Sequence, residues 1–131
     1  MQKKFSICIL DDEPIVGDRL KPELEDDGYE VEIFTDSASA IKRLDERSFD
    51  LFITDLKMEG IDGMRFLEKV KEGCKNSEVI MISGYATLES VRESFVRGAY
   101  DMIAKPFRID EIRSSVKNAI NQVSKSKQTN N

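Results

Sequence analysis

Short, continuously apolar runs alternate five times with longer amphipathic segments along the chain. Runs such as LFIT and VIMI lack polar alternation, which is typical of parallel strands buried on both faces. The pattern predicts five strands, over residues 5–10, 30–34, 51–54, 79–82 and 100–103. The segments between and after them predict five helices, over residues 14–27, 37–47, 63–72, 87–97 and 109–123.

This alternation predicts the fold class. Five strand–helix units in 131 residues indicate one α/β domain with a parallel sheet and helices on both faces. We expect a flavodoxin-like, doubly wound sheet with strand order 2-1-3-4-5. In such sheets ligands bind beyond the carboxyl ends of the strands, where the strand order reverses. Functional side chains are therefore expected directly after the first and third strands.

Glycine and proline residues mark where the predicted helices end or bend. Gly28, Gly73 and Gly98 lie where helices should stop. Pro22 lies inside the first helix and should bend or break it, because its ring clashes with the carbonyl of Asp18. We expect residues 1–123 to form the domain. The polar residues 124–131 are expected to be a disordered tail, or a linker cut from a longer regulator.

The first strand ends in the motif ILDDEP, in which Asp11, Asp12 and Glu13 are adjacent. Neighbouring carboxylates raise each other's pKa unless a positive group lies between them. Alone, these acids could simply favour the start of a helix. The motif therefore leaves two interpretations open, a favourable helix N-terminus or a cation site.

Polar side chains also end the other strands at the same sheet edge. Asp55 ends the third strand, Ser83 the fourth and Lys105 the fifth. The chain has no histidine, which excludes a Ser-His-Asp triad and histidine-bound zinc. Carboxylates without histidine or thiolate ligands suit Mg²⁺. A carboxylate can also accept a phosphoryl group, with Mg²⁺ and a lysine to stabilise the transferring charge.

The composition of the chain limits which binding partners and which cellular location are expected. The net charge of −5 argues against direct nucleic-acid binding by this domain, and a basic partner or a metal fits better. No run is long enough for a membrane span, and the first residues lack the apolar region of a signal peptide. Cys8, in an apolar strand, and Cys74, at a helix end, indicate reduced cysteines and a cytoplasmic protein.

Four motifs, ILDDEP, ITDLKMEGIDGMRFL, VIMISGYAT and GAYDMIAKPF, resemble the receiver domain of two-component response regulators. They look closest to receivers of enhancer-binding, NtrC-like transcription regulators, and with the alternation they cover residues 5–123. The resemblance implies a phosphorylation-activated signalling domain rather than an enzyme. It also implies a sensor histidine kinase as phosphoryl donor, a homodimer formed on phosphorylation, and an output domain in a longer native chain.

The resemblance further implies a metal and acceptor site. Asp55 would be the phosphoacceptor. Asp55 and Asp12 would coordinate Mg²⁺ directly, together with the backbone carbonyl of Lys57, and Asp11 would bind it through water.

The same resemblance implies the switch residues. Ser83 would be the switch hydroxyl and Lys105 the phosphoryl-binding cation, with Lys105–Pro106 expected to be a cis bond. Two positions depart from the family pattern. Glu59 replaces the usual proline and should loosen the loop after the phosphoacceptor. Met102 replaces the usual aromatic switch residue, and its parity in the strand should face it away from the acidic pocket.

Two other functions stay open. An Mg²⁺-dependent phosphohydrolase with an aspartyl nucleophile usually has an acid two residues further on. Leu56 and Lys57 follow Asp55, which counts against that function, although Asp11 is followed by Glu13 at this spacing. A receiver-like adaptor that binds partners without phosphate would tolerate loss of Asp55.

Overall fold

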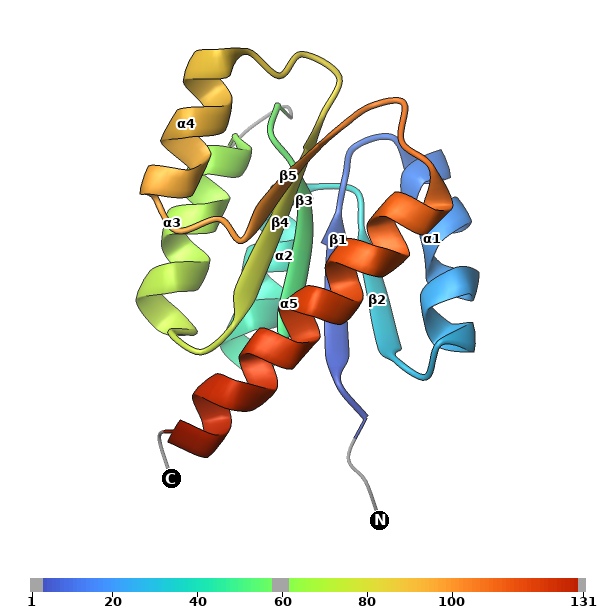
Figure 1. Cartoon of the computed structure of the whole chain (residues 1–131), viewed down its shortest axis with the longest axis vertical. Coiled ribbons are helices and arrows are strands. Elements are labelled where there is room, and N and C mark those ends of the chain that lie inside the picture. Colours follow the sequence, from blue (N-terminus) through green and yellow to red (C-terminus); the bar gives the residue numbers. More distant parts are fainter. Residues whose placement is uncertain (1–3, 58–61, 130–131) are drawn as a thin grey trace.

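The computed structural model describes residues 4–57 and 62–129. Five parallel strands form one sheet in the order β2-β1-β3-β4-β5, which confirms the predicted topology (Figure 1). The strands are β1 (Ser6–Leu10), β2 (Glu30–Phe34), β3 (Leu51–Asp55), β4 (Glu78–Ser83) and β5 (Asp101–Ala104). The helices are α1 (Pro14–Asp26), α2 (Ser37–Glu46), α3 (Gly63–Gly73), α4 (Leu88–Val96) and α5 (Ile109–Thr129).

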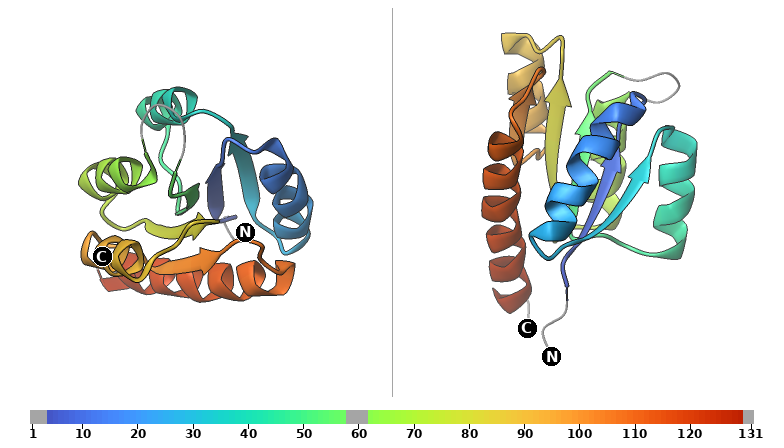
Figure 2. Two further views of the ribbon diagram at one scale, coloured as in Figure 1. Left: turned by 90° about the horizontal axis from the view of Figure 1, so that it is seen from above. Right: turned by 90° about the vertical axis from the view of Figure 1, so that its right-hand side faces the viewer.

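Helices cover both faces of the sheet (Figure 2). A hydrophobic core lies on each face. Ile7 and Ile9 of β1 face α1 and α5, whereas Cys8 and Leu10 face α2 and α3. This alternation follows from the two-residue period of a strand. Because both faces are covered, β1 and β3 are buried along their whole length. Burial on both faces explains why the sequences of these two strands are continuously apolar.

Strand register brings the carboxyl ends of the strands to one edge of the sheet. Leu10 of β1 pairs with Thr54 of β3, and Ser83 of β4 pairs with Ala104 of β5. The loops that follow β1, β4 and β5 all lie at the upper edge in Figure 1. Residues directly after these strands are therefore neighbours in space.

Helix α1 begins differently from the next three helices. Asp36, Asp62 and Thr87 cap α2, α3 and α4 by accepting hydrogen bonds from the backbone N–H three residues further on. The N-cap of α1 is Glu13, and its side chain makes no capping hydrogen bond. The carboxylate of Glu13 is thus available for another contact.

The observed ends of the helices agree only in part with those predicted from glycine and proline residues. Gly28 and Gly98 have φ angles of +99° and +106°, which residues with a Cβ rarely adopt, and both follow a helix as predicted. Gly73 is instead the last residue of α3. α1 continues through Pro22 to Asp26, so the predicted break is wrong, whereas a bend there stays a prediction.

The predicted disorder of the polar tail is wrong for residues 124–129, because α5 extends to Thr129. Val123 is its last buried apolar residue. The following Ser-Lys-Ser-Lys-Gln run contains neither glycine nor proline, and lysine and glutamine favour helices. The division into a domain over 1–123 and a tail or linker over 124–131 stays a prediction. In the part of the chain that the structure describes, no helix is long and apolar enough to cross a membrane.

Candidate phosphoryl-acceptor and metal site

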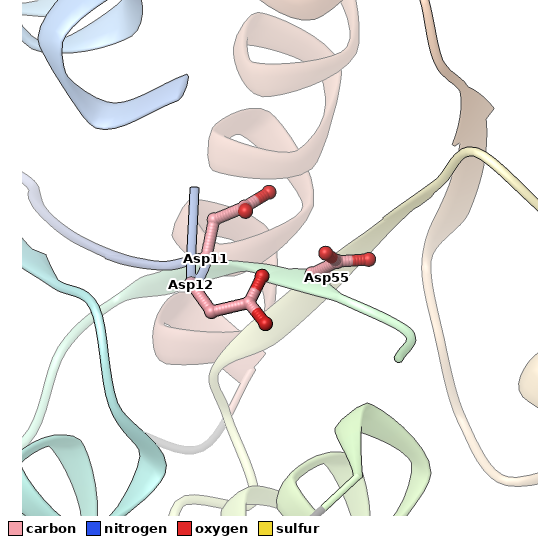
Figure 3. A group of neighbouring side chains, drawn as sticks. All are labelled: Asp11, Asp12 and Asp55. Carbon is pink, nitrogen blue, oxygen red and sulfur yellow. The ribbon is translucent and has the colours of Figure 1, made fainter. Parts of the chain in front are cut away.

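Three aspartates converge at the carboxyl edge of β1 and β3. One carboxylate oxygen from each of Asp11, Asp12 and Asp55 lies within 4.8 Å of the others (Figure 3). Asp11 and Asp55 are buried, whereas Asp12 is exposed. Asp11 and Asp12 directly follow β1, and Asp55 is the last residue of β3. The structure therefore brings together the three aspartates that the sequence singled out.

Lys105 adds one positive charge to this group. Its Nζ lies 2.8 Å from Asp11 Oδ2, 2.8 Å from Glu13 Oε1 and 3.2 Å from Asp55 Oδ2. The last two contacts are hydrogen bonds, whereas the contact with Asp11 is an ion pair without hydrogen-bond geometry. The contact between Glu13 and Lys105 was not predicted. The sequence marked Glu13 only as the third acid of ILDDEP, since a side chain's direction cannot be inferred from spacing.

Burial and this lysine shift the pKa values of the group in opposite directions. Burial raises the pKa of Asp11, and the charge of Asp55 adds to this, while Lys105 and the Glu13 N–H offset part of it. Burial lowers the pKa of Lys105, but its attraction to Asp11, Glu13 and Asp55 raises that pKa by more, so the ammonium stays charged. The hydrogen bond from Lys105 lowers the pKa of Glu13.

The donor set fits a hard divalent cation. Asp11 Oδ2 is a buried carboxylate oxygen that accepts no hydrogen bond among the described residues. Its charged neighbour there is the Lys105 ammonium, which is shared with Glu13 and Asp55, so a metal ion or its bound water could satisfy this oxygen further. Three carboxylates and no nitrogen or sulfur ligand suit Mg²⁺, which binds through few carboxylates and retains water.

Ser83 and Lys57 lie next to the acidic group. Ser83 is buried at the end of β4, and its Oγ accepts a hydrogen bond of 3.0 Å from the Tyr85 N–H. The Ser83 carbonyl accepts a bond of 2.8 Å from the Lys105 N–H, which ties these two strand ends together. The Lys57 N–H lies 3.3 Å from Asp55 Oδ1. The residues predicted to hold the metal and the phosphoryl group thus lie on adjoining segments of one sheet edge.

Comparisons with known proteins identify the family of this chain. The family model described as "Response regulator receiver domain" matches residues 7–117. The chain belongs to the response regulator receiver family. It is a receiver of two-component signalling, and hence a signalling domain rather than a conventional enzyme.

The chain is similar to response regulators described as NtrX-like. It is 33% identical over 129 residues to a "Putative response regulator NtrX-like" of Rickettsia felis, covering 97% of this chain and 27% of that protein. The chain thus spans about a quarter of the length of this relative.

Solved structures give the same fold. A CheY-like receiver from Methanospirillum hungatei matches with a TM-score of 0.89 at 30% identity, covering 95% of this chain and 99% of that one. A beryllofluoride-activated NtrC4 receiver domain dimer matches with a TM-score of 0.85 at 27% identity, covering 90% and 98%.

Of the two positions that depart from the family pattern, the structure describes Met102 but not Glu59. Met102 is partly buried and packs against the core on the α2–α3 face, so its side chain lies away from the acidic group, as its parity predicted. Glu59 lies outside the described residues. The Lys105–Pro106 bond is cis, as the resemblance implied.

Gly63 supports the receiver site and was noted in the sequence only as a helix start. A Cβ at this position would lie 2.1 Å from the Asp55 carbonyl oxygen and 2.8 Å from Leu56 Cα. Both neighbours are backbone atoms that cannot move aside cheaply. Glycine therefore allows the start of α3 to approach the end of β3. A glycine at a first helical position was the available signal.

Proposed function

We propose that this receiver is a phosphorylation switch in which Asp55 accepts a phosphoryl group from the phosphohistidine of a sensor histidine kinase. The observation that supports the proposal most is the convergence of Asp11, Asp12, Asp55 and Lys105 at one sheet edge. A surface cluster of acids would not require a half-buried lysine among them. A site that handles a phosphoryl group does, because charge develops on its oxygens during transfer.

In the proposed reaction a carboxylate oxygen of Asp55 attacks the phosphorus. An O–P bond forms, the P–N bond of the phosphohistidine breaks, and the electron pair leaves with the imidazole. Lys105, now 3.2 Å from Asp55 Oδ2, is within reach to donate a hydrogen bond to a phosphoryl oxygen. The Ser83 hydroxyl, at the end of the neighbouring strand, would donate another and move toward it.

Mg²⁺ is the proposed cofactor. Asp12 and Asp55 would hold it directly with the Lys57 carbonyl, and Asp11 would hold it through water. When bound, the ion supplies positive charge that offsets the carboxylates and the transferring group. The excess of carboxylates over ammonium groups in the site supports this assignment.

The proposed output is a change in the α4–β5–α5 surface and in dimerisation. Leu88, Phe95 and Val96 expose apolar side chains on α4, with Leu88 78% and Val96 80% exposed. Exposed apolar groups on one helix suit a partner surface. The NtrC4 receiver, a structural relative, is described as a dimer when activated by beryllofluoride. A homodimer, an output domain in a longer chain and a cytoplasmic location complete the proposal. The receiver itself would not contact nucleic acid.

Met102 is proposed to make this switch shallow, because an unbranched thioether has several rotamers and separates two states less sharply than an aromatic ring. Met102→Tyr should therefore widen the difference in dimerisation with and without beryllofluoride, measured by sedimentation. If the native chain responds as strongly as the variant, Met102 does not weaken the switch.

One experiment tests the central proposal. The chain is incubated with acetyl phosphate and Mg²⁺, and peptide mass spectrometry locates an acid-stable, base-labile modification. We expect one acyl phosphate per chain, on Asp55. Modification elsewhere, or rapid turnover of the donor without an accumulated acyl phosphate, would contradict the proposal. The second result would support a phosphohydrolase instead.

A further inference from the structure

Glu13 reaches across the site instead of capping its own helix. It is the N-cap of α1, yet its side chain makes no capping hydrogen bond, and its Oε1 lies 2.8 Å from Lys105 Nζ. Its main chain is fixed, because the Glu13 N–H donates a 2.8 Å hydrogen bond to Asp11 Oδ1. The carboxylate thus links the loop after β1 to the loop after β5.

This contact occupies one of the N–H donors that a phosphoryl group could use. An ammonium has three N–H donors, and Lys105 donates hydrogen bonds to Glu13 and Asp55 and forms an ion pair with Asp11. The side chains of Asp11 and Asp55 are 1% and 9% exposed, whereas that of Glu13 is 60% exposed. Only Glu13 can exchange its contact with Lys105 for water at little cost. It is therefore the partner that an incoming phosphoryl group would displace.

Glu13 also faces an open hollow beside Lys105. It lines this hollow of about 430 Å³ together with Arg19, Tyr85 and Lys105. The Arg19 guanidinium is 5.2 Å from the centre of the Phe107 ring and is held to this side of the hollow. Glu13 is thus the negative charge nearest to Lys105 that faces solvent, and it repels donors in proportion to their own negative charge.

We infer that Glu13 is a specificity-determining residue that occupies Lys105 in the unphosphorylated chain and disfavours highly anionic phosphoryl donors. This inference rests on the proposed function of Asp55. The Glu13 carboxylate would therefore favour N-phosphoryl donors, which carry less negative charge, over acyl phosphates. With phosphoramidate, the Asp55 O–P bond forms, the P–N bond breaks and ammonia leaves. With acetyl phosphate, the same bond forms, the donor's P–O bond breaks and acetate leaves.

The test compares these two donors on the native chain and on Glu13→Gln, with Mg²⁺, by following the phosphorylated fraction with intact-mass spectrometry. We expect the acetyl phosphate rate to rise in the variant much more than the phosphoramidate rate. The ratio of the two rates should increase about three- to tenfold, the low end of electrostatic effects on association. Glu13→Gln should fold normally, because no capping bond is lost.

Two control variants separate charge at this position from charge in general. Glu25→Gln removes the same charge from the exposed side of α1, and the structure describes no ion pair for the Glu25 side chain. In this variant the ratio of the acetyl phosphate rate to the phosphoramidate rate should equal that of the native chain. Glu13→Asp keeps the charge and should also stay near native. In 1 M salt, where the Debye length falls to about 3 Å, the difference in donor ratio between Glu13→Gln and Glu25→Gln should shrink, because repulsion at longer range is screened.

An unchanged donor ratio in Glu13→Gln, or an equal change in Glu25→Gln, would overturn the role of Glu13 while leaving phosphorylation of Asp55 intact. Failure of the proposed function is distinguishable, because neither donor would then label Asp55 in the native chain, and the inference would fall with it.

Discussion

Two charged clusters of this receiver, one at the carboxyl edge of the sheet and one between β2 and α2, differ in balance and burial. The β2–α2 cluster combines two arginines with three glutamates, namely Arg43, Arg47, Glu30, Glu32 and Glu46. Its members are 27–57% exposed, and Arg43 makes contacts of 2.9 Å with Glu32 and 3.1 Å with Glu46. The site sets four carboxylates against a single lysine and buries two of them.

The difference shows which cluster is structural. In the β2–α2 cluster the planar arginine forks satisfy the glutamates, and hydrogen bonding by Arg43 lowers the pKa of Glu32. In the site Asp11 Oδ2 accepts no hydrogen bond among the described residues, and burial raises the pKa of Asp11. A cluster that is complete by itself stabilises the fold. A cluster that lacks positive charge is a candidate ligand site.

The largest expected effect that separates the clusters is on phosphorylation. Asp55→Asn should abolish labelling by acetyl phosphate, because an amide oxygen is too weak a nucleophile to form the acyl phosphate. Glu32→Gln, which removes a charge from the β2–α2 cluster, should leave labelling at the native level. Mass spectrometry measures both. A stoichiometric acyl phosphate on Asp55→Asn would refute the assignment of the acceptor.

The second expected effect is on stability with metal. Mg²⁺ at ten times its dissociation constant should raise the free energy of unfolding by about 1.4 kcal/mol near neutral pH. The gain comes from the unbalanced cluster, so it should persist in Glu32→Gln and be lost in Asp55→Asn. Thermal melts with Mg²⁺ and with EDTA measure it. A melting temperature that is the same with Mg²⁺ and with EDTA would contradict the proposed Mg²⁺ site.

The smallest expected effect is an opposite pH dependence of two charge-removing variants, measured without metal. The lowered pKa of Glu32 contributes stability that is present at neutral pH and lost as pH falls through that pKa, so Glu32→Gln should be destabilised only at neutral pH. The raised pKa of Asp11 contributes stability that is lost as pH rises through it. Asp11→Asn should therefore be more stable than the native chain at neutral pH.

Both changes should be on the order of 1 kcal/mol or less. As pH falls, the effect of Asp11→Asn should fade first, because the pKa of Asp11 is raised, and that of Glu32→Gln should fade only at lower pH, because the pKa of Glu32 is lowered. Chemical denaturation in EDTA between neutral and acidic pH measures them. Destabilisation of Asp11→Asn at neutral pH would mean that the Lys105 contact outweighs burial at that carboxylate.

The sequence alone determined the layout of the fold and most of the site. Buried parallel strands need continuous apolar runs, so the strands could be placed from those runs. Strand order and the ends of β1 and β3 then located Asp11, Asp12 and Asp55 together, because parallel strands end at one edge. Local rules misplaced two boundaries, since α1 does not break at Pro22 and α5 extends past Val123.

Only the tertiary structure decided how the charges are shared. Glu13 and Lys105 are 92 positions apart, and no local pattern states which of three adjacent acids turns toward the lysine. The end of β1 buries Asp11 and exposes Asp12, although the two residues are chemically alike. The strand ends fix where each backbone stops, but the direction of each side chain depends on neighbours from distant segments. The sequence therefore determined which charges gather, and the folded chain decided which of them are paired.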